Sequence, residues 1–355
     1  MKAKDPKTLS GNLLILIWII SIIALTLVAA LNISSNISSH GISGERAIAT
    51  WNTSSQAYEN KSHTDVLAGV YLNRIPRISM KDSNFDVDFY IWFRWKGNDV
   101  SPGQNFQIVN GEINNKQKQA EWESGDEHYE QYQVTANINK YFDMHIYPLD
   151  SQNITIEIED SLNSIDELSY IAEASNDCNM SRQIIVPGYD TKWISPLTRV
   201  HNYETNFGSP WTNTSAANYS QLIFGASLSH QGWGLYFKLF HALFIAVLVA
   251  ILSFFLKPHY SPRFVVGVGA LFASVANYYN ILSTQPSVGY LTLADIINLI
   301  GVTTIFLSLI QSTISYYMYD HQLYKGLCKR FDVFSAITFT SCYIYINLWI
   351  MGSVH

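Results

Sequence analysis

Cysteine and enzyme motifs are scarce in this 355-residue chain. Its three cysteines stand at positions 178, 328 and 342, and only Cys178 falls within residues 32–232. That middle part therefore has no second cysteine for an internal disulfide, and its stability must come from its own core. The sequence also lacks H-E-x-x-H, G-x-S-x-G, a phosphate-binding glycine loop and a Cys/His cluster. These absences argue against an enzyme.

Charge is also scarce, at 14% of the residues, and its distribution divides the chain into three parts. Residues 1–31 carry three lysines and one aspartate, residues 32–232 carry 13 basic and 24 acidic side chains, and residues 233–355 carry six basic and three acidic ones. We therefore predict three domains with these boundaries. They are a signal peptide or N-terminal anchor, an acidic domain large enough to bury a core, and a membrane-embedded domain.

Residues 264–294 contain no charged side chain. Long apolar segments predict four membrane spans, each able to cross a hydrocarbon core of ~30 Å as a helix. The spans are residues 235–256, 264–282, 291–317 and 332–351. The loops after the first and third spans are basic, which places them in the cytosol and the acidic domain outside. We expect a multi-pass protein of the cell membrane, surrounded by lipid, with the acidic domain in the periplasm or outside the cell.

The first 31 residues combine features of a signal peptide and of an anchor. Three lysines precede the apolar run of residues 12–31, and Val28, Ala29 and Ala30 offer a cleavage site of small residues. The sequence favours a cleaved signal peptide, although the run is long for one. In either case the lysines stay in the cytosol.

Alternating apolar and polar residues indicate β-strands in the acidic domain. The alternation is clearest in residues 85–95, where Phe85, Val87, Phe89, Ile91 and Phe93 share one face. Further alternating stretches are residues 129–138, 154–159, 184–186, 200–203 and 222–228. Many short strands separated by turn residues predict an antiparallel β-sandwich or barrel, followed by the four-helix transmembrane bundle.

The second predicted span has two unlike faces. One face is bulky and apolar, and the other carries Gly269, Ala273, Ala276, Asn277 and Asn280. A small face permits close packing between membrane helices. It equally suits the wall of a water-filled pore, so the helix alone does not decide between the two.

Residues 141–160 contain the motif Tyr147-Pro148-Leu149-Asp150-x-Gln152. This motif resembles the signature loop of the pentameric ligand-gated ion channels, the Cys-loop receptor superfamily. The two loop cysteines of that family would fall at Lys140 and Ile154, so the sequence is similar to the prokaryotic members that lack the disulfide. In the membrane part, SPRFVVGVG resembles the start of the family's pore helix and NILSTQPSVGYLTLAD its outer end and following linker.

The resemblance implies a homopentamer in which five copies of the second span surround an axial pore. Two criteria then place different residues on the pore wall. Matching to the family's pore selects Val265, Gly269, Phe272, Ala276 and Tyr279. The small face instead selects Gly269, Ala273, Ala276 and Asn280, a rotation of about 60°.

Phe272 and Tyr279 are the gate candidates, because a ring of aromatic side chains closes a narrow pore by excluding water. The alternative for Phe272 is packing between neighbouring helices. Ion selectivity stays open: the segment Ser261-Pro262-Arg263 is closer to the anion-selective pattern, whereas the acidic domain concentrates cations. We favour cations slightly.

For the agonist, small-molecule or ionic, the resemblance implies an aromatic box between neighbouring acidic domains, since aromatic faces attract cationic amines. The candidates are Trp193, Tyr203, Trp211 and Tyr219 from the later strands, with Trp92 and Trp95 from the adjacent subunit. The alternative for each is ordinary packing. The resemblance also implies coupling through a loop-to-linker contact that involves Tyr147, Pro148, Asp150 and Pro286.

Acidic groups around residues 86–88, 121–127 and 157–160 offer oxygen ligands for Ca²⁺ as a modulator, although we favour a solvated acidic face as their explanation. No other cofactor, no metal site and no nucleic-acid partner is expected. The sequence thus favours a ligand-gated ion channel. The alternative is a non-conducting, membrane-anchored ligand receptor or adhesin.

Overall fold

The computed structural model describes residues 16, 18–24, 26–27, 63–173, 177–208, 217–230, 233–283, 285–320 and 325–354. The chain divides into two compact units. The β unit comprises residues 44–143 and 151–231, and the helical unit comprises residues 1–43, 144–150 and 232–355. Residues 144–150 therefore belong to the helical unit, although the residues on both sides of them belong to the β unit.

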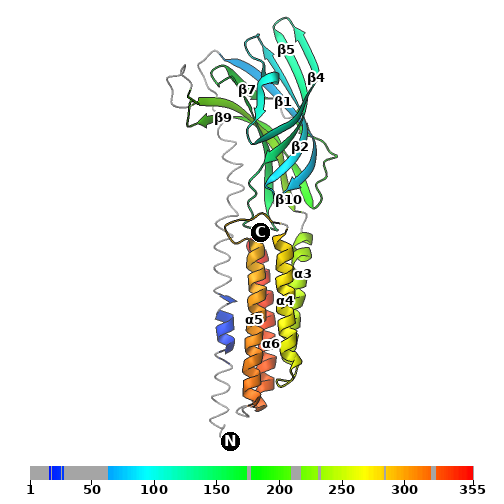
Figure 1. Cartoon of the computed structure of the whole chain (residues 1–355), viewed down its shortest axis with the longest axis vertical. Helices are drawn as coiled ribbons and strands as arrows, with labels where there is room; N and C mark the ends of the chain where they lie inside the picture. The colour runs from blue at the N-terminus through cyan, green and yellow to red at the C-terminus, as the bar shows by residue number, and fades with distance from the viewer. Residues whose placement is uncertain are drawn as a thin grey trace. The chain divides into compact units, whose positions relative to one another are not determined.

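The β unit is a sandwich of two sheets (Figure 1). Sheet A has the strand order β4-β5-β2-β1-β7, with β8 also paired to β1, and sheet B has the order β3-β6-β10-β9. Sheet A contains β1 (Thr64–Ser79), β2 (Asn84–Lys96), β4 (Gly111–Ser124), β5 (Glu127–Asn139), β7 (Leu168–Ala172) and β8 (Asn179–Met180). Sheet B contains β3 (Phe106–Ile108), β6 (Ser151–Asp160), β9 (Tyr189–Tyr203) and β10 (Ala217–His230), and the short helix α2 (Pro102–Asn105) precedes β3.

The predicted sandwich is confirmed, with one correction to its antiparallel character. β1 runs parallel to both β7 and β8. The reason is connectivity: the chain enters β7 from β6 of the other sheet, and not through a hairpin from β1. A second correction concerns residues 184–186, which lie outside any strand.

The core of the sandwich forms from the alternating faces that the sequence indicates. The five apolar residues of β2 between Phe85 and Phe93 are all at most 1% exposed. Phe89 meets Phe224 of β10 edge to face, with ring centroids 5.2 Å apart. This contact joins the two sheets. The long strand β4 escaped prediction because nearly all its side chains are polar and exposed, so it has no buried alternation.

The helical unit contains α3 (Gly234–Leu252) with its continuation η1 (Ser253–Phe255), α4 (Pro262–Leu282), α5 (Leu293–Asp320) and α6 (Lys325–Val354). All four helices are long and apolar enough to cross a membrane, and they run alongside one another (Figure 1). Pro262 opens α4, where its missing N–H costs no hydrogen bond. Thr292 and Asp295 cap α5 reciprocally through hydrogen bonds of 3.1 and 2.8 Å between each backbone N–H and the other side chain.

Lys116 of β4 gives the β unit a pH-dependent term in its stability. Its ammonium lies 3.8 Å from the ring centroid of Phe106 and donates to the carbonyl oxygen of Gln104 at 2.9 Å. Burial lowers the pKa of Lys116 to about 8, from 10.5. Between these two pH values the unfolded chain binds more protons than the folded one, so stability rises with pH.

We predict that Lys116→Met removes this rise, because the substituted side chain carries no proton to lose. The measurement is the melting temperature of the purified full chain at steps from pH 7 to pH 10.5. Lys192→Met, at an exposed position, is the matched control and should keep the slope of the unsubstituted chain. An unchanged slope in Lys116→Met would contradict the assignment.

Candidate functional site

Helix α4 presents one face to the rest of the helical unit and leaves the other exposed. Its buried residues recur every three or four positions, which places them on a single stripe: Arg263, Gly267, Ala270, Ser274, Asn277 and Ile281. Asn277 therefore lies on the buried stripe, and not with the other small or polar residues that the sequence grouped with it. The exposed side of α4 is free of charged residues.

All the residues predicted to line a pore lie on the exposed side of α4, namely Val265, Gly269, Phe272, Ala273, Ala276, Tyr279 and Asn280. Val265, Phe272 and Tyr279 are 68%, 72% and 71% exposed in the single chain. Their spacing of seven residues places them in one line, opposite the buried stripe. Ala273 and Asn280 lie toward one edge of the exposed face. The exposed face is therefore centred on the residues selected by matching to the family's pore, and not on those of the small face.

Arg263, the only charged residue of α4, points into the helical unit and is fully buried. Its guanidinium donates to both carboxylate oxygens of Asp332 on α6, at 3.0 and 2.8 Å. It also donates to Ser312 and Gln311 of α5, at 3.1 and 3.2 Å. A charge in a membrane interior requires such partners. Asp332 is accordingly an interior residue of α6, which begins at Lys325, earlier than the sequence predicts.

Residues 144–150 cap the first turn of α5. The N–H groups of Leu293 and Ala294 donate to the carbonyl oxygens of His145 and Tyr147, at 2.9 and 3.1 Å. The first N–H groups of a helix have no partner within it, so the loop satisfies two of them. We call residues 144–150 the capping loop.

The linker before α5 also holds the capping loop. The ring of His145 stacks on that of Tyr290, with centroids 3.8 Å apart, and the N–H of Met144 donates to the Tyr290 hydroxyl at 3.0 Å. Of the predicted coupling residues, Tyr147, Pro148 and Asp150 are buried, and Pro286 is half-buried. Sequence reasoning placed the contact near Pro286 and missed Tyr290, four residues further on.

Two of the predicted ligand residues meet on sheet B. The rings of Tyr203 and Tyr219 are perpendicular, with centroids 5.6 Å apart. Behind them the buried carboxylate of Glu159 accepts hydrogen bonds from the Tyr203 hydroxyl at 2.9 Å and the Gln221 amide at 2.8 Å. His201 lies 2.5 Å from the same carboxylate through Nδ1. Burial and the bond to Glu159 raise the pKa of Tyr203, so its hydroxyl stays protonated. We call this group the tyrosine cluster.

Trp193 lies apart from the tyrosine cluster. It pairs with Ala226, whereas Tyr203 pairs with Ala217 at the other end of the same two strands. Ten residues of extended chain separate Trp193 from Tyr203, which corresponds to roughly 30 Å. The indole of Trp193 contacts core residue Phe224 at 6.5 Å between ring centroids. Trp211, the fourth candidate from this region, lies outside the described residues.

Trp92 and Trp95 line one open pocket of about 1120 Å³ at sheet A. Trp92 lies across Gly69, where a Cβ atom would collide with the indole, and its N–H donates to Glu173. Arg94 donates to the same carboxylate. Trp95 stacks on His128 with ring centroids 5.2 Å apart. We call this the tryptophan pocket. Sequence reasoning missed Glu173, because the parallel pairing of β7 with the distant strand β1 is what places it there.

Two of the acidic groups considered for Ca²⁺, Asp86 and Asp88, are engaged with other side chains. Asp88 accepts hydrogen bonds from Arg74 at 2.6 Å and Gln133 at 3.1 Å. Asp86 accepts from Arg77 and Asn137, and the bond from Arg77 lowers the pKa of Asp86. Across the described part of the chain, no group of three or more His, Cys, Asp or Glu side chains is arranged to hold a metal ion.

No family model and no curated protein matches this chain. The function must therefore be inferred from the exposed face of α4, the capping loop and the two aromatic sites.

We predict that Asp332→Asn destabilises the helical unit by about 3–5 kcal/mol, because it leaves the buried guanidinium of Arg263 without its counter-charge. The measurement is the unfolding of the detergent-solubilised chain by heat or by a denaturing detergent. The double variant Arg263→Met with Asp332→Leu is the control and should recover most of the loss. Equal stability of Asp332→Asn and the unsubstituted chain would contradict this role of the ion pair.

Proposed function

We propose that the chain is one subunit of a pentameric ligand-gated ion channel in the cell membrane, with its β unit outside and a pore lined by α4. The observation that carries the proposal is the exposed face of α4. This face joins aromatic side chains to glycine, alanine and asparagine within a helix apolar enough to span a membrane. The coarser layout, a β-rich domain followed by four apolar helices, is compatible with that architecture.

A closed ring of subunits explains this face better than lipid does. Asn280 is exposed in the single chain, and an amide that faces hydrocarbon costs free energy. A ring of five subunits about an axis would turn the exposed faces toward a shared lumen, where Asn280 meets water and Gly269 and Ala276 leave space. Phe272 and Tyr279 then form two rings that exclude water from the closed pore.

The burial of Arg263 supports cation passage. The guanidinium that suggested an anion-type pore mouth is held by Asp332 inside the subunit, and the exposed face of α4 carries no charge. Residues 32–232 carry 13 basic and 24 acidic side chains, and their summed field attracts cations to the outer entrance. With no positive ring opposing that field, cations are the favoured ions.

The two aromatic sites suit a ligand that bridges adjacent subunits. The tyrosine cluster lies on sheet B and the tryptophan pocket on sheet A. In a ring, sheet B of one subunit can meet sheet A of the next, which would bring the two sites together around one small cationic ligand. The alternative function, a non-conducting receptor or adhesin, would use the same aromatic sites. That alternative does not explain why the exposed face of α4 combines aromatic side chains with glycine, alanine and asparagine.

Current recording from the expressed full chain tests the proposal directly. The chain is reconstituted in planar bilayers or expressed in oocytes, and pH, Ca²⁺ and simple amines are stepped in turn. Gated current that reverses at the Nernst potential of the cations supports the whole proposal. A folded chain that is monomeric by light scattering and silent in every condition contradicts it and supports the anchored receptor.

We predict that Phe272→Ala raises the leak current in the resting state, because the substitution removes an aromatic ring that dewets the closed pore. Phe334→Ala is the matched control, since Phe334 is an exposed phenylalanine of α6 and lies on no proposed pore wall. Current is measured at equal surface expression. Leak that is unchanged in Phe272→Ala, or equally raised in Phe334→Ala, would remove Phe272 from the gate.

We predict that Tyr290→Phe shifts the half-activating stimulus by about two- to tenfold, because it removes one hydrogen bond between the capping loop and the linker. Tyr290→Ala should have a larger effect, since it also removes the ring that stacks on His145. Dose-response curves measure both. Tyr260→Phe, at an exposed tyrosine, is the control; an equal shift in this variant would contradict a specific role for Tyr290.

A further inference from the structure

The N-terminal helical segment, residues 16, 18–24 and 26–27, packs against the helical unit. Ile22 is 7% exposed and belongs to the same apolar cluster as Ile305 of α5 and Phe339 of α6. Trp18 packs against this cluster and also against Leu327 and Phe331 at the start of α6. The segment therefore covers apolar side chains of α5 and α6 that would otherwise be exposed.

One face of the segment makes these contacts. Trp18, Ile22 and Thr26 recur every four residues, as the contact stripe of a helix does. Outside this stripe, Leu16 and Ile20 are 53% and 55% exposed. The hydroxyl of Thr26 donates to the carbonyl oxygen of Ile22 at 2.8 Å. This bond satisfies the polar group inside the segment, as a membrane helix requires.

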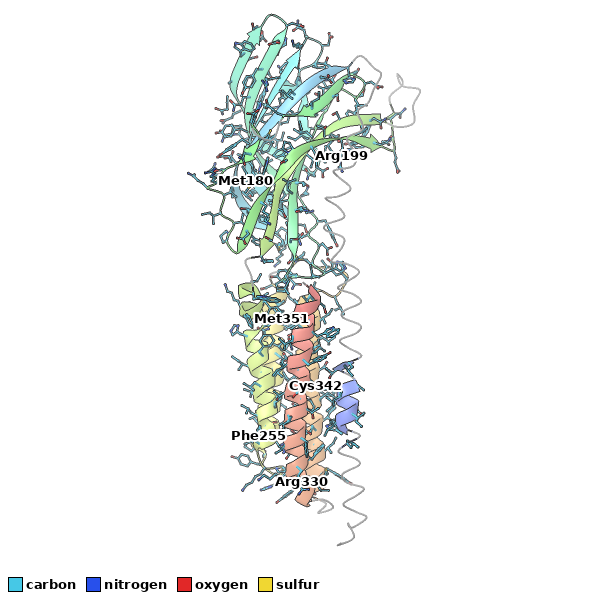
Figure 2. All side chains as sticks on the ribbon, turned by 180° about the vertical axis from the view of Figure 1, so that it is seen from behind. Met180, Arg199, Phe255, Arg330, Cys342 and Met351 are labelled. Atoms are coloured by element: carbon cyan, nitrogen blue, oxygen red, sulfur yellow. The ribbon has the colours of Figure 1, made fainter. Side chains whose placement is uncertain are left out.

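The direction of the segment agrees with its charges. Trp18 lies at the start of α6, beside Leu327, whereas Thr26 lies beside Cys342 and Tyr343 further along the same helix. The segment thus runs parallel to α6. Figure 2 shows the segment (blue) beside α6 at the level of Cys342. The end of the segment that follows the three lysines in the sequence is therefore the one beside the start of α6, where the sequence is also basic.

We propose that the N-terminal helical segment is retained in the mature protein as part of a fifth membrane-spanning helix, docked between α5 and α6. The apolar run of 20 residues matches the thickness of a bilayer. It is longer than the 7–15 apolar residues of a typical signal peptide. Loss of the segment would expose the apolar side chains that Ile22 covers. The proposal is independent of channel activity.

Cysteine cross-linking tests both retention and docking. Thr26 and native Cys342 line the same two small pockets, of about 220 and 400 Å³. In the full chain with Thr26→Cys, copper phenanthroline or a short bis-methanethiosulfonate reagent should link positions 26 and 342 in isolated membranes. Mass spectrometry of the non-reduced peptides identifies the link. Intact mass of the untreated protein shows whether residues 1–30 are present.

Ile20→Cys is the matched control, because Ile20 is more than half exposed and lies off the contact stripe. Its yield of linked peptide should be at least tenfold lower, and Thr26→Cys with Cys342→Ser should give none. An intact mass that lacks the first 30 residues overturns retention. A full-length protein with equal yields at positions 20 and 26, or with no link at position 26, overturns docking.

Discussion

The ion pair between Arg263 and Asp332 determines how α4 sits in the helical unit. Within a low-dielectric bundle a guanidinium is stable only where its donors are occupied. The partners of Arg263 come from the residue that follows η1, from α5 and from α6: the carbonyl oxygen of Leu256, Ser312 and Gln311, and Asp332. A single side chain near the start of α4 is thus bonded to two neighbouring helices and to the chain just after η1. Rotating α4 about its axis would break these bonds together.

This constraint has a consequence along the rest of α4, at Val265, Phe272 and Tyr279. With Arg263 turned inward, the helical repeat turns Val265, Phe272 and Tyr279 outward. The outward residues thus present a line of large apolar side chains that no intramolecular contact requires. In the proposed pentamer, this line would face the other copies of the helix across the pore. The buried charge and the exposed aromatic stripe are therefore two consequences of one helix orientation.

Sequence patterns predicted those parts of the structure that depend on local periodicity. The face of β2 from Phe85 to Phe93 was predictable because alternation with period two follows directly from strand geometry. The rotation of α4 was not predictable from bulk and polarity, because Asn277 is polar yet buried. The partner of Arg263 is 69 residues away along the chain, and no local pattern links the two.

Long-range pairing likewise decided which aromatic candidates meet. Tyr203 and Tyr219 belong to adjacent strands at paired ends, so the register of β9 and β10 brings them together. The same register carries Trp193 to the opposite ends of those strands. Sequence proximity had grouped Trp193 with the two tyrosines because residues 193–219 are close along the chain. In a hairpin, however, only residues near the turn stay close in space.

The capping loop is held against α5 by backbone groups. Its neighbours on both sides, Asp143 and Ser151, belong to the β unit, yet its carbonyl oxygens complete the first turn of α5. Helix N–H groups without partners are costly inside a protein, so the loop cannot leave α5 without a substitute acceptor. The contact between the side chains of His145 and Tyr290 adds to these two backbone hydrogen bonds, which form independently of it. Because these hydrogen bonds use backbone groups, they tolerate many side chains at these positions, and a motif search therefore detects them only weakly. Tyr147 and Pro148 belong to a recognisable sequence motif. Every residue has a carbonyl oxygen, however, so the hydrogen bonds that hold α5 have no sequence signature.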